Sequence, residues 1–374
     1  MVVGAGAIGL AVAYRLAEAG ASVRLIDASG TRGASWAAAG MLAPISEAIF
    51  GEEELTRLNL AAVAKFAEFA GELRARTGKS VGLRSDGTLA AAFNSDDRAA
   101  LDRLTNFRTA LGLRTERLTA TEARRLEPFL ATGIRGAVLA ADDLSVDNRR
   151  YVEAIRQACA SAGVELVRAE VVSLIERNGR VAGVLVDSGE SWAADTVVLC
   201  TGAATERFTG LPIRPVKGQI LRLNVPQRLR RDGPVLTRTV RGIVRGGEVY
   251  LVPRDDGEVV VGATQEQQGW DTTVTAGGIY ELLRNAYELV PISSEFTFVE
   301  ARAGLRPGTP DNGPILGWLG EGLLVASGHF RNGILLSPLT GAAVANLVAG
   351  KPIEEEWKPF SPNRFLPGCP QEQG

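Results

Sequence analysis

A glycine pattern at the amino terminus restricts the fold of this chain more than any other feature. Residues 4–9 (Gly-Ala-Gly-Ala-Ile-Gly) match G-x-G-x-x-G, follow a pair of valines and open a stretch with helical apolar spacing. Gly20 is typical of a residue that ends such a helix. Residues 23–27 are then expected to form a second strand that ends in an acid, Asp27. This strand–turn–helix–strand order predicts a Rossmann-like α/β unit.

Each glycine of the pattern has its own role in binding a dinucleotide. Gly4 allows the tight turn, Gly6 lets the backbone approach the pyrophosphate, and Gly9 lets the helix pack on the strand. The amino terminus of the helix offers N–H groups to the phosphates, and Asp27 can accept hydrogen bonds from the ribose hydroxyls. The pattern alone does not separate FAD from NAD.

Two further segments favour a flavin. Residues 33–42 are a run of small residues with a lone hydroxyl, which suits a backbone that lies against a flat ligand, although a close-packed helix start is an equal alternative. Residues 326–336 form a second polar, glycine-punctuated loop that opens a helix near the other end of the chain. This loop holds the only histidine, His329, so any catalytic triad or multi-histidine metal site would depend on that residue alone.

Composition excludes several classes of protein. The chain has 374 residues, 45% of them hydrophobic, which predicts about two domains of a globular enzyme. A net charge of −2 gives no reason to expect nucleic acid or a membrane as a partner. No secretory signal and no bilayer-spanning run is visible, so we expect a cytoplasmic protein. Cys159, Cys200 and Cys369 are scattered, which argues against a disulfide framework, a metal site or an iron–sulfur cluster.

The order of the expected elements indicates two discontinuous domains. Asn178-Gly179 predicts a hairpin, and the apolar strand 196–202 ends in Thr201-Gly202, where a cofactor would lie. Short strands with turn glycines between 217 and 300, and one helix at about 278–289, suit an antiparallel sheet. We therefore predict an α/β protein: a Rossmann-like cofactor domain with an α+β, antiparallel-sheet substrate domain. The cofactor domain takes residues 1–83, 145–215 and 301–365, the substrate domain takes 84–144 and 216–300, and 366–374 form a tail.

Each candidate site residue has a possible role in binding or catalysis and an alternative, purely structural role. Arg306 follows an expected strand at 295–302, where Pro307 and Gly308 fix a turn; its fork suits a carboxylate, but an exposed turn arginine fits equally. Arg331 either binds substrate or caps a loop. Tyr250 is a strand tyrosine that packs in the core or contacts substrate. For His329 a flavin contact is favoured over a general base or a satisfied loop histidine.

Two other features are assigned no chemistry. Asp142-Asp143 is expected to be a solvated pair of loop acids rather than an acid/base or metal site. Arg302 is expected to pack on its strand or form an ion pair.

The motifs together resemble the D-amino-acid oxidase family of FAD enzymes and, within it, the glycine oxidases of thiamine biosynthesis. The resemblance runs through residues 4–9, 34–42, 215–218 (Pro-Val-Lys-Gly), 250–254 (Tyr-Leu-Val-Pro-Arg), 304–309 (Gly-Leu-Arg-Pro-Gly-Thr), 328–335 (Gly-His-Phe-Arg-Asn-Gly-Ile-Leu) and 360–365 (Phe-Ser-Pro-Asn-Arg-Phe). The occurrence of the last four of these stretches in one chain is specific to the family.

The resemblance implies a two-domain fold with non-covalent FAD and a set of site residues. Arg306 corresponds to the arginine that binds the substrate carboxylate, Arg331 to a second substrate contact, and Tyr250 to an aromatic hydroxyl over the substrate. Glu248 stands where some members have a histidine, which leaves the fine substrate preference open. The implied flavin contacts are Ala7, Ile8, Asp27, Ala28, Ala34, Ser35, Ala39, Gly40, Met41, Val172, His329, Phe330, Arg331, Asn332, Gly333, Ile334 and Leu335.

The implied activity is oxidation of glycine with oxygen as acceptor, without a protein base. Sarcosine or a D-amino acid is the nearest alternative substrate; a nicotinamide-dependent dehydrogenase and a non-catalytic flavoprotein are more distant readings. The resemblance also implies a homotetramer and transfer of the imine product to thiazole synthesis.

Overall fold

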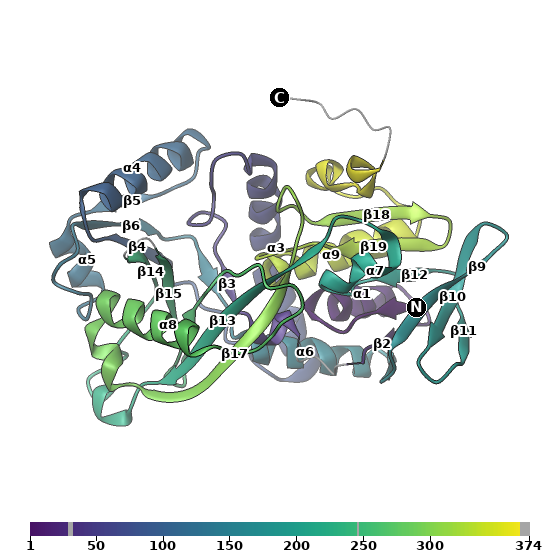
Figure 1. The fold of residues 1–374 in the computed structure, drawn as a ribbon, viewed down its shortest axis with the longest axis horizontal. Coiled ribbons are helices and arrows are strands. Elements are labelled where there is room, and N and C mark those ends of the chain that lie inside the picture. Colours follow the sequence, from purple (N-terminus) through teal and green to yellow (C-terminus); the bar gives the residue numbers. More distant parts are fainter. Residues whose placement is uncertain (29–32, 245–246, 367–374) are drawn as a thin grey trace.

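The chain divides into two sheet-based halves joined by long strands (Figure 1). The computed structural model describes residues 1–28, 33–244 and 247–366. One half contains the amino terminus and a mostly parallel sheet. Its strands, in spatial order, are β18 (Ile315–Gly320), β19 (Leu323–Ser327), β12 (Val197–Leu199), β1 (Val2–Val3), β2 (Arg24–Ile26) and β8 (Glu165–Val167).

The parallel sheet is covered on both faces, as sheets of this kind require. Val2 and Leu25 point into the core beneath the helices, whereas Val3 and Ile26 pack against a small antiparallel sheet on the other face. The covering helices are α1 (Ala7–Glu18), α3 (Glu53–Thr77), α6 (Asn148–Ser161) and α9 (Gly333–Val348). The small sheet consists of β9 (Val171–Arg177), β10 (Arg180–Val186) and β11 (Ser191–Ala193).

The hairpin expected at Asn178-Gly179 is confirmed. Both residues have positive φ angles, 51° and 79°, which is the conformation that a two-residue turn between β9 and β10 needs. This small sheet lies at the far edge of the first half (Figure 1).

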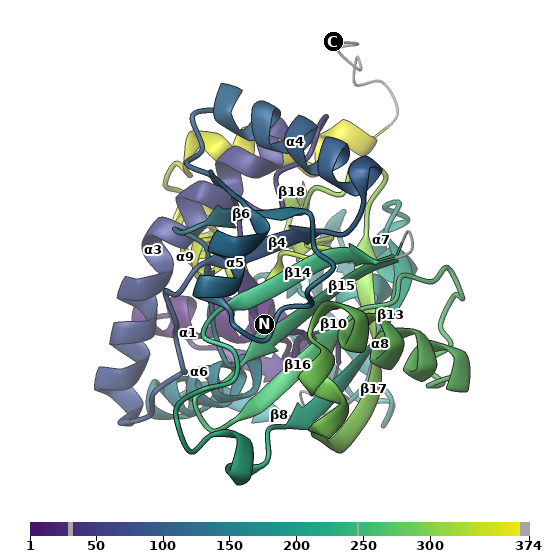
Figure 2. The same cartoon turned by 90° about the vertical axis from the view of Figure 1, so that its left-hand side faces the viewer.

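The second half is built on a large twisted sheet (Figure 2). All its neighbouring pairs are antiparallel except β14 and β4, which run parallel. Its strands, in spatial order, are β17 (Thr297–Gly308), β13 (Arg214–Asn224), β16 (Glu258–Gly262), β15 (Gly247–Pro253), β14 (Thr239–Val244), β4 (Thr88–Ala92), β6 (Gly136–Ala140) and β5 (Glu116–Leu118).

Alternation along these strands creates an outer and an inner face. Leu221 and Leu251 belong to the outer core beneath α8 (Ala276–Leu289). Ile220 and Val252 belong to an inner cluster with Ala39, which comes from the first half. The inner face of the large sheet therefore faces the first half.

The remaining elements are short or peripheral. They are α2 (Ala34–Ala37), β3 (Met41–Leu42), α4 (Ser95–Ala110), α5 (Ala120–Leu126), β7 (Leu144–Ser145), α7 (Glu206–Thr209) and the 3₁₀ turns at Gly202–Thr205, Gln227–Leu229, Pro291–Glu295, Glu355–Phe360 and Pro362–Phe365. The strand β3 pairs with β7 and so ties the segment after α2 to the segment before α6.

One strand differs from the sequence-based expectations. The strand that carries Arg306 does not end near residue 302: β17 continues to Gly308, because it pairs with β13 along its length. The domain boundary placed at 300/301 therefore falls inside one strand, and the division into domains stays a prediction. The tail at 367–374, with Cys369, lies outside the described residues.

The expectation of a solvated acid pair at Asp142-Asp143 is wrong for Asp143. Asp142 forms an exposed ion pair with Arg114. Asp143 is fully buried, and its two carboxylate oxygens accept hydrogen bonds from the backbone N–H groups of Ile45 and Ser46 at 3.0 and 3.2 Å. Burial raises the pKa of Asp143 to about 6. Asp143 thus anchors the loop after β3.

Candidate functional site

A cavity of about 860 Å³ lies between the carboxyl edge of the first sheet and the inner face of the second. Its walls come from segments far apart in the sequence, including the loops after β1, β2 and β12, the α2 segment, β17 and the start of α9. Two sides of the cavity differ in chemistry. We call them the glycine side (residues 4–8 with Asp27) and the arginine side (Tyr250, Arg306 and Arg331).

The glycine side has the geometry that a pyrophosphate needs. Gly4 adopts a φ of 99°, which is open to glycine alone at low cost. A Cβ on Gly9 would lie 1.7 Å from the carbonyl oxygen of Gly4, so the turn closes only because Gly9 has no side chain. The Ala5 N–H donates to the Asp27 carboxylate at 2.7 Å, and that carboxylate also lines the cavity.

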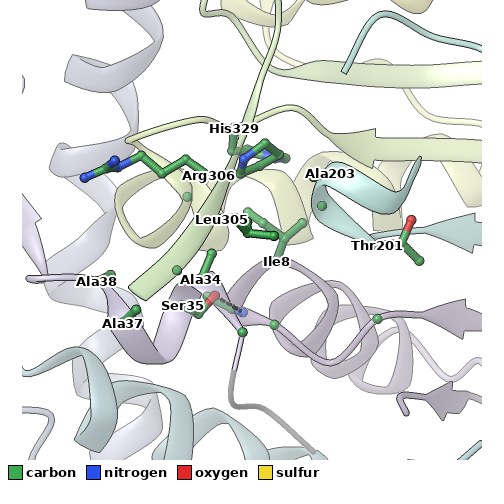
Figure 3. Close-up of a pocket in the computed structure, with 18 of the residues that line it drawn as sticks. Ile8, Ala34, Ser35, Ala37, Ala38, Thr201, Ala203, Leu305, Arg306 and His329 are labelled. Carbon is green, nitrogen blue, oxygen red and sulfur yellow. Dashed lines mark hydrogen bonds between the residues drawn. The ribbon is translucent and has the colours of Figure 1, made fainter. Parts of the chain in front are cut away.

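The small-residue segment 33–41 forms one wall of the cavity (Figure 3). Ala34–Ala37 is a single helical turn, as the close-packed alternative predicts, and three of its residues, Ala34, Ser35 and Ala37, also line the cavity. Contact of this wall with a flat ligand stays a prediction. The hydroxyl of Ser35 accepts a hydrogen bond from the Ala7 N–H at 3.0 Å. The segment is packed closely against β17, because a Cβ on Gly304 would lie 2.8 Å from the Ala37 methyl group.

Arg306 projects into the cavity from β17 (Figure 3). Its Nη1 donates to the Thr264 carbonyl at 3.2 Å, and it forms no ion pair with any described residue. Gly218 on the neighbouring strand makes room for it, because a Cβ there would lie 2.2 Å from Arg306 Nη1. The Gly218 of the Pro-Val-Lys-Gly stretch thus shapes the space that the guanidinium occupies.

Tyr250 lies on the same side and is also accommodated by a glycine. A Cβ on Gly262, its partner across the sheet, would lie 2.4 Å from the Tyr250 hydroxyl. Burial raises the pKa of Tyr250, and the Arg306 charge partly offsets that rise. The phenol is therefore protonated at neutral pH and can donate a hydrogen bond into the cavity.

Arg331 completes the arginine side just before α9. Its guanidinium lies 5.4 Å from the centre of the Phe330 ring, and its Nη2 is 3.7 Å from a carboxylate oxygen of Glu52. Arg331 is thus partly neutralised, whereas Arg306 is not.

His329 lines the cavity but is almost fully buried. Its Nε2 lies 3.0 Å from the Thr340 hydroxyl, and burial lowers the pKa of the ring to about 3. The ring is neutral near pH 7, so it is poorly suited to accept a proton. The bond to Thr340 is what a satisfied loop histidine would form, and a contact to the flavin stays a prediction.

Not every residue predicted to contact a flavin lines the cavity. Val172 is half exposed on β9, and its neighbour Val171 lines the cavity instead. The other predicted residues that do not line it are Gly9, Asn332 and Leu335. Gly9 acts through packing, as described above. Thr201 and Gly202 line the cavity where β12 ends, as the strand pattern predicts.

Sequence reasoning missed Glu47 and the loop around Trp270, which both line the cavity. The Glu47 carboxylate pairs with Arg241 at 3.3 Å. Its loop is fixed from behind by Asp143 and by Arg108, which donates to the Ser46 and Ala48 carbonyls. No sequence motif marks Glu47, because its position depends on contacts with distant strands.

Other chemistries find no support in the described part of the chain. No group of three or more His, Cys, Asp or Glu residues there could hold a metal ion. Cys159 and Cys200 are buried free thiols whose pKa is raised by burial, to about 12 for Cys159. None of the described helices combines the length and hydropathy needed to cross a membrane.

The cavity fits an FAD molecule on the evidence of its own residues. The glycine turn and the amino terminus of α1 suit the pyrophosphate, and the Asp27 carboxylate suits the ribose. The closely packed small-residue wall suits a flat ring, and the arginine side lies next to it.

Known proteins bear out this interpretation. Residues 1–347 match the family described as "FAD dependent oxidoreductase". A glycine oxidase from Geobacillus kaustophilus is 36% identical over 98% of this chain and 96% of its own length. The crystal structure of glycine oxidase from that organism superposes with a TM-score of 0.90 at 34% identity, covering 99% of this chain and 98% of the other.

Another relative is longer than this chain. The bifunctional protein ThiO/ThiG from Synechocystis is 35% identical over 98% of this chain, which spans about half (54%) of that relative's length. Together, the family match and the cavity that fits FAD show that the chain belongs to the FAD dependent oxidoreductase family.

Proposed function

We propose that this chain oxidises the amino group of glycine or a closely related small amino acid. The observation that carries the proposal is Arg306, a cavity-facing guanidinium that has no ion-pair partner among the described residues. A planar fork of this kind suits the carboxylate of an amino acid. The similarity to glycine oxidases supports glycine as that amino acid.

The residues of the arginine side would hold the substrate in a reactive orientation. Arg306 binds the carboxylate, the Tyr250 hydroxyl donates to it, and Arg331 adds a second positive charge. Bound FAD supplies the hydride acceptor, and its reoxidation by oxygen gives hydrogen peroxide. The amine must be neutral, so that its lone pair assists as hydride leaves the α-carbon. Catalysis is then mostly positioning, and water converts the released imine to glyoxylate and ammonia.

A peroxide assay with matched small molecules tests the proposal. Glycine, sarcosine and D-alanine carry both a carboxylate and an amine, methylamine lacks the carboxylate, and acetate lacks the amine. We expect turnover of glycine, little turnover of methylamine, and competitive inhibition by acetate. A higher kcat/KM for sarcosine or D-alanine than for glycine would show that the preferred substrate is another small amino acid. Equal kcat/KM for methylamine and glycine would contradict carboxylate recognition.

Three wider expectations remain proposals. Relatives that are named bifunctional ThiO/ThiG proteins support transfer of the imine to thiazole synthesis in thiamine formation. A homotetramer and a cytoplasmic location follow only from the sequence-based expectations, and gel filtration and cell fractionation would test them.

A further inference from the structure

Arg254 is a buried cation with an unusual set of contacts. It follows β15, and it is only 5% exposed. It forms no ion pair with any described residue, and its Nε and Nη1 have no hydrogen-bond partner. Burial lowers the pKa of Arg254 to about 10, so the side chain stays charged at neutral pH. The charges of Asp147, Glu258 and Asp256 offset part of the cost of burying Arg254, although none of them forms an ion pair with it. A buried charge without a direct partner is destabilising, so its presence calls for a further role.

The one hydrogen bond of this guanidinium links it to the small-residue wall of the cavity. Its Nη2 donates to the backbone carbonyl of Ala39. Asn148, at the start of α6 and fully buried, donates in the same way to the carbonyls of Ser35 and Trp36 at 2.8 and 3.1 Å. We call Asn148 and Arg254 the carbonyl clamp, since both bind main-chain carbonyls of this one wall.

By holding a carbonyl group, the carbonyl clamp also determines the direction of the N–H group in the same peptide. In a trans peptide the N–H points away from the C=O. With the Ala39 carbonyl held by Arg254, the Gly40 N–H therefore points away from Arg254. Gly40 lines the cavity, and no acceptor for its N–H, or for that of Ala39, is found among the described residues. Apart from the Ser35 hydroxyl, the cavity-lining side chains of this wall carry no hydrogen-bond donor, so the Ala39 and Gly40 N–H groups add main-chain donors to it.

We propose that Arg254 is a positioning residue for the flavin: it orients and polarises the Ala39–Gly40 peptide toward the ring and provides a fixed positive charge that favours its reduced form. A cation on the carbonyl makes the N–H of the same peptide a stronger donor. Fixed charges and preorganised donors stabilise negative charge that develops in a site closed to water. The charge of Arg254, which nearby carboxylates offset only in part, would thus be stabilised further by electrons on the cofactor. This inference rests on FAD binding and not on the identity of the substrate.

Three substitutions of Arg254 separate charge from hydrogen bonding. Arg254→Lys keeps the charge without the planar fork, Arg254→Gln keeps a donor without the charge, and Arg254→Met removes both. Arg108→Met is the matched control. Arg108 is also a buried arginine that donates to main-chain carbonyls, and burial also lowers its pKa to about 10. Neither arginine lines the cavity, but Arg108 binds the Ser46 and Ala48 carbonyls and none in the small-residue wall.

For each holoprotein we would measure the flavin absorption spectrum, the midpoint potential by dye equilibration and the Tm, and for each apoprotein the Kd for added FAD. We expect the potential to fall in the order wild type, Lys, Gln, Met. A tenfold loss in preference for the reduced form corresponds to about 30 mV for a two-electron couple. We expect Arg108→Met to lower the Tm and leave the potential and spectrum unchanged.

Equal potentials and spectra in wild type, Arg254→Lys and Arg254→Gln would overturn the proposal, because a purely structural arginine would lower only the Tm. The Lys and Gln variants keep this comparison available if Arg254→Met does not fold. Because no substrate is added, a failure of amine oxidation would not affect the outcome.

Discussion

The glycine side and the arginine side of one cavity are built on opposite principles. On the glycine side the binding groups are backbone N–H donors and the Asp27 carboxylate, and the turn closes only because Gly4 and, behind it, Gly9 have no side chain. On the arginine side the binding groups are charged or hydroxyl-bearing side chains. There, Gly218 and Gly262 on neighbouring strands only make room for Arg306 and Tyr250.

This difference explains how far each side tolerates change. The glycine side is local in sequence: β1, the turn, α1 and the end of β2 fix it, so a change there affects folding and cofactor binding together. The arginine side is assembled from β15, β17 and the start of α9, so a change there can alter recognition while the fold is kept. The predictions below test this distinction.

The largest effect is expected for Gly9→Ala. The new methyl group would lie 1.7 Å from the Gly4 carbonyl oxygen, and only a backbone shift could relieve the clash. We expect loss of FAD binding and a decrease of more than about 3 kcal/mol in the free energy of unfolding. Gly71→Ala in α3 is the control, because no atom lies near its added Cβ; it should raise stability by about 0.5–1 kcal/mol. Normal FAD content in Gly9→Ala would contradict the claim that folding and cofactor binding depend together on the glycine side.

Arg306→Ala should leave FAD content unchanged and reduce kcat/KM for glycine. The reduction should correspond to a loss of about 2–5 kcal/mol in transition-state stabilisation, because the substrate carboxylate loses its partner in the cavity. Arg306→Lys should fall between wild type and Ala, since it keeps the charge without the fork. Steady-state kinetics and the flavin spectrum measure both properties. Near-normal turnover in Arg306→Ala would contradict the proposal that Arg306 binds the substrate carboxylate.

Asp143, which anchors the loop after β3, should make the stability of the fold sensitive to pH. Its folded-state pKa of about 6 lies above the ordinary value, so its contribution to stability is full at low pH and is lost as the pH rises through 6. Relative to Asp143→Asn, the wild type should lose up to about 3 kcal/mol of unfolding free energy between pH 4 and 7. Urea unfolding across that range measures the difference. Parallel pH profiles for the two proteins would contradict it.

The smallest effect is expected for His329→Gln, on the apparent pKa in the pH profile of kcat/KM. The profile should rise with pH until the substrate amine is neutral. Because burial lowers the pKa of His329 to about 3, His329→Gln should keep the apparent pKa of that rise. Loss of the pH-dependent limb in the variant would identify His329 as the base instead.

The sequence predicts the two sides of the cavity unequally, for a physical reason. The turn at residues 4–9, Asp27 and the Asn178-Gly179 hairpin depend on neighbours within about thirty residues, so their patterns survive in the sequence. Arg306 was identified, but its position within β17 was not, because a long pairing with β13 overrides the turn preference of Pro307 and Gly308. Glu47, the burial of Asp143 and the carbonyl clamp depend on contacts across more than fifty residues and leave no local pattern.

The central claim is that one cavity holds FAD on its glycine side and presents a small amino acid to it from its arginine side. The visible spectrum of the purified protein, recorded without oxygen before and after glycine is added, tests this claim most directly. We predict flavin absorption bands that bleach with glycine and return when air is admitted. Flavin bands that persist with glycine, sarcosine and D-alanine alike would contradict the account.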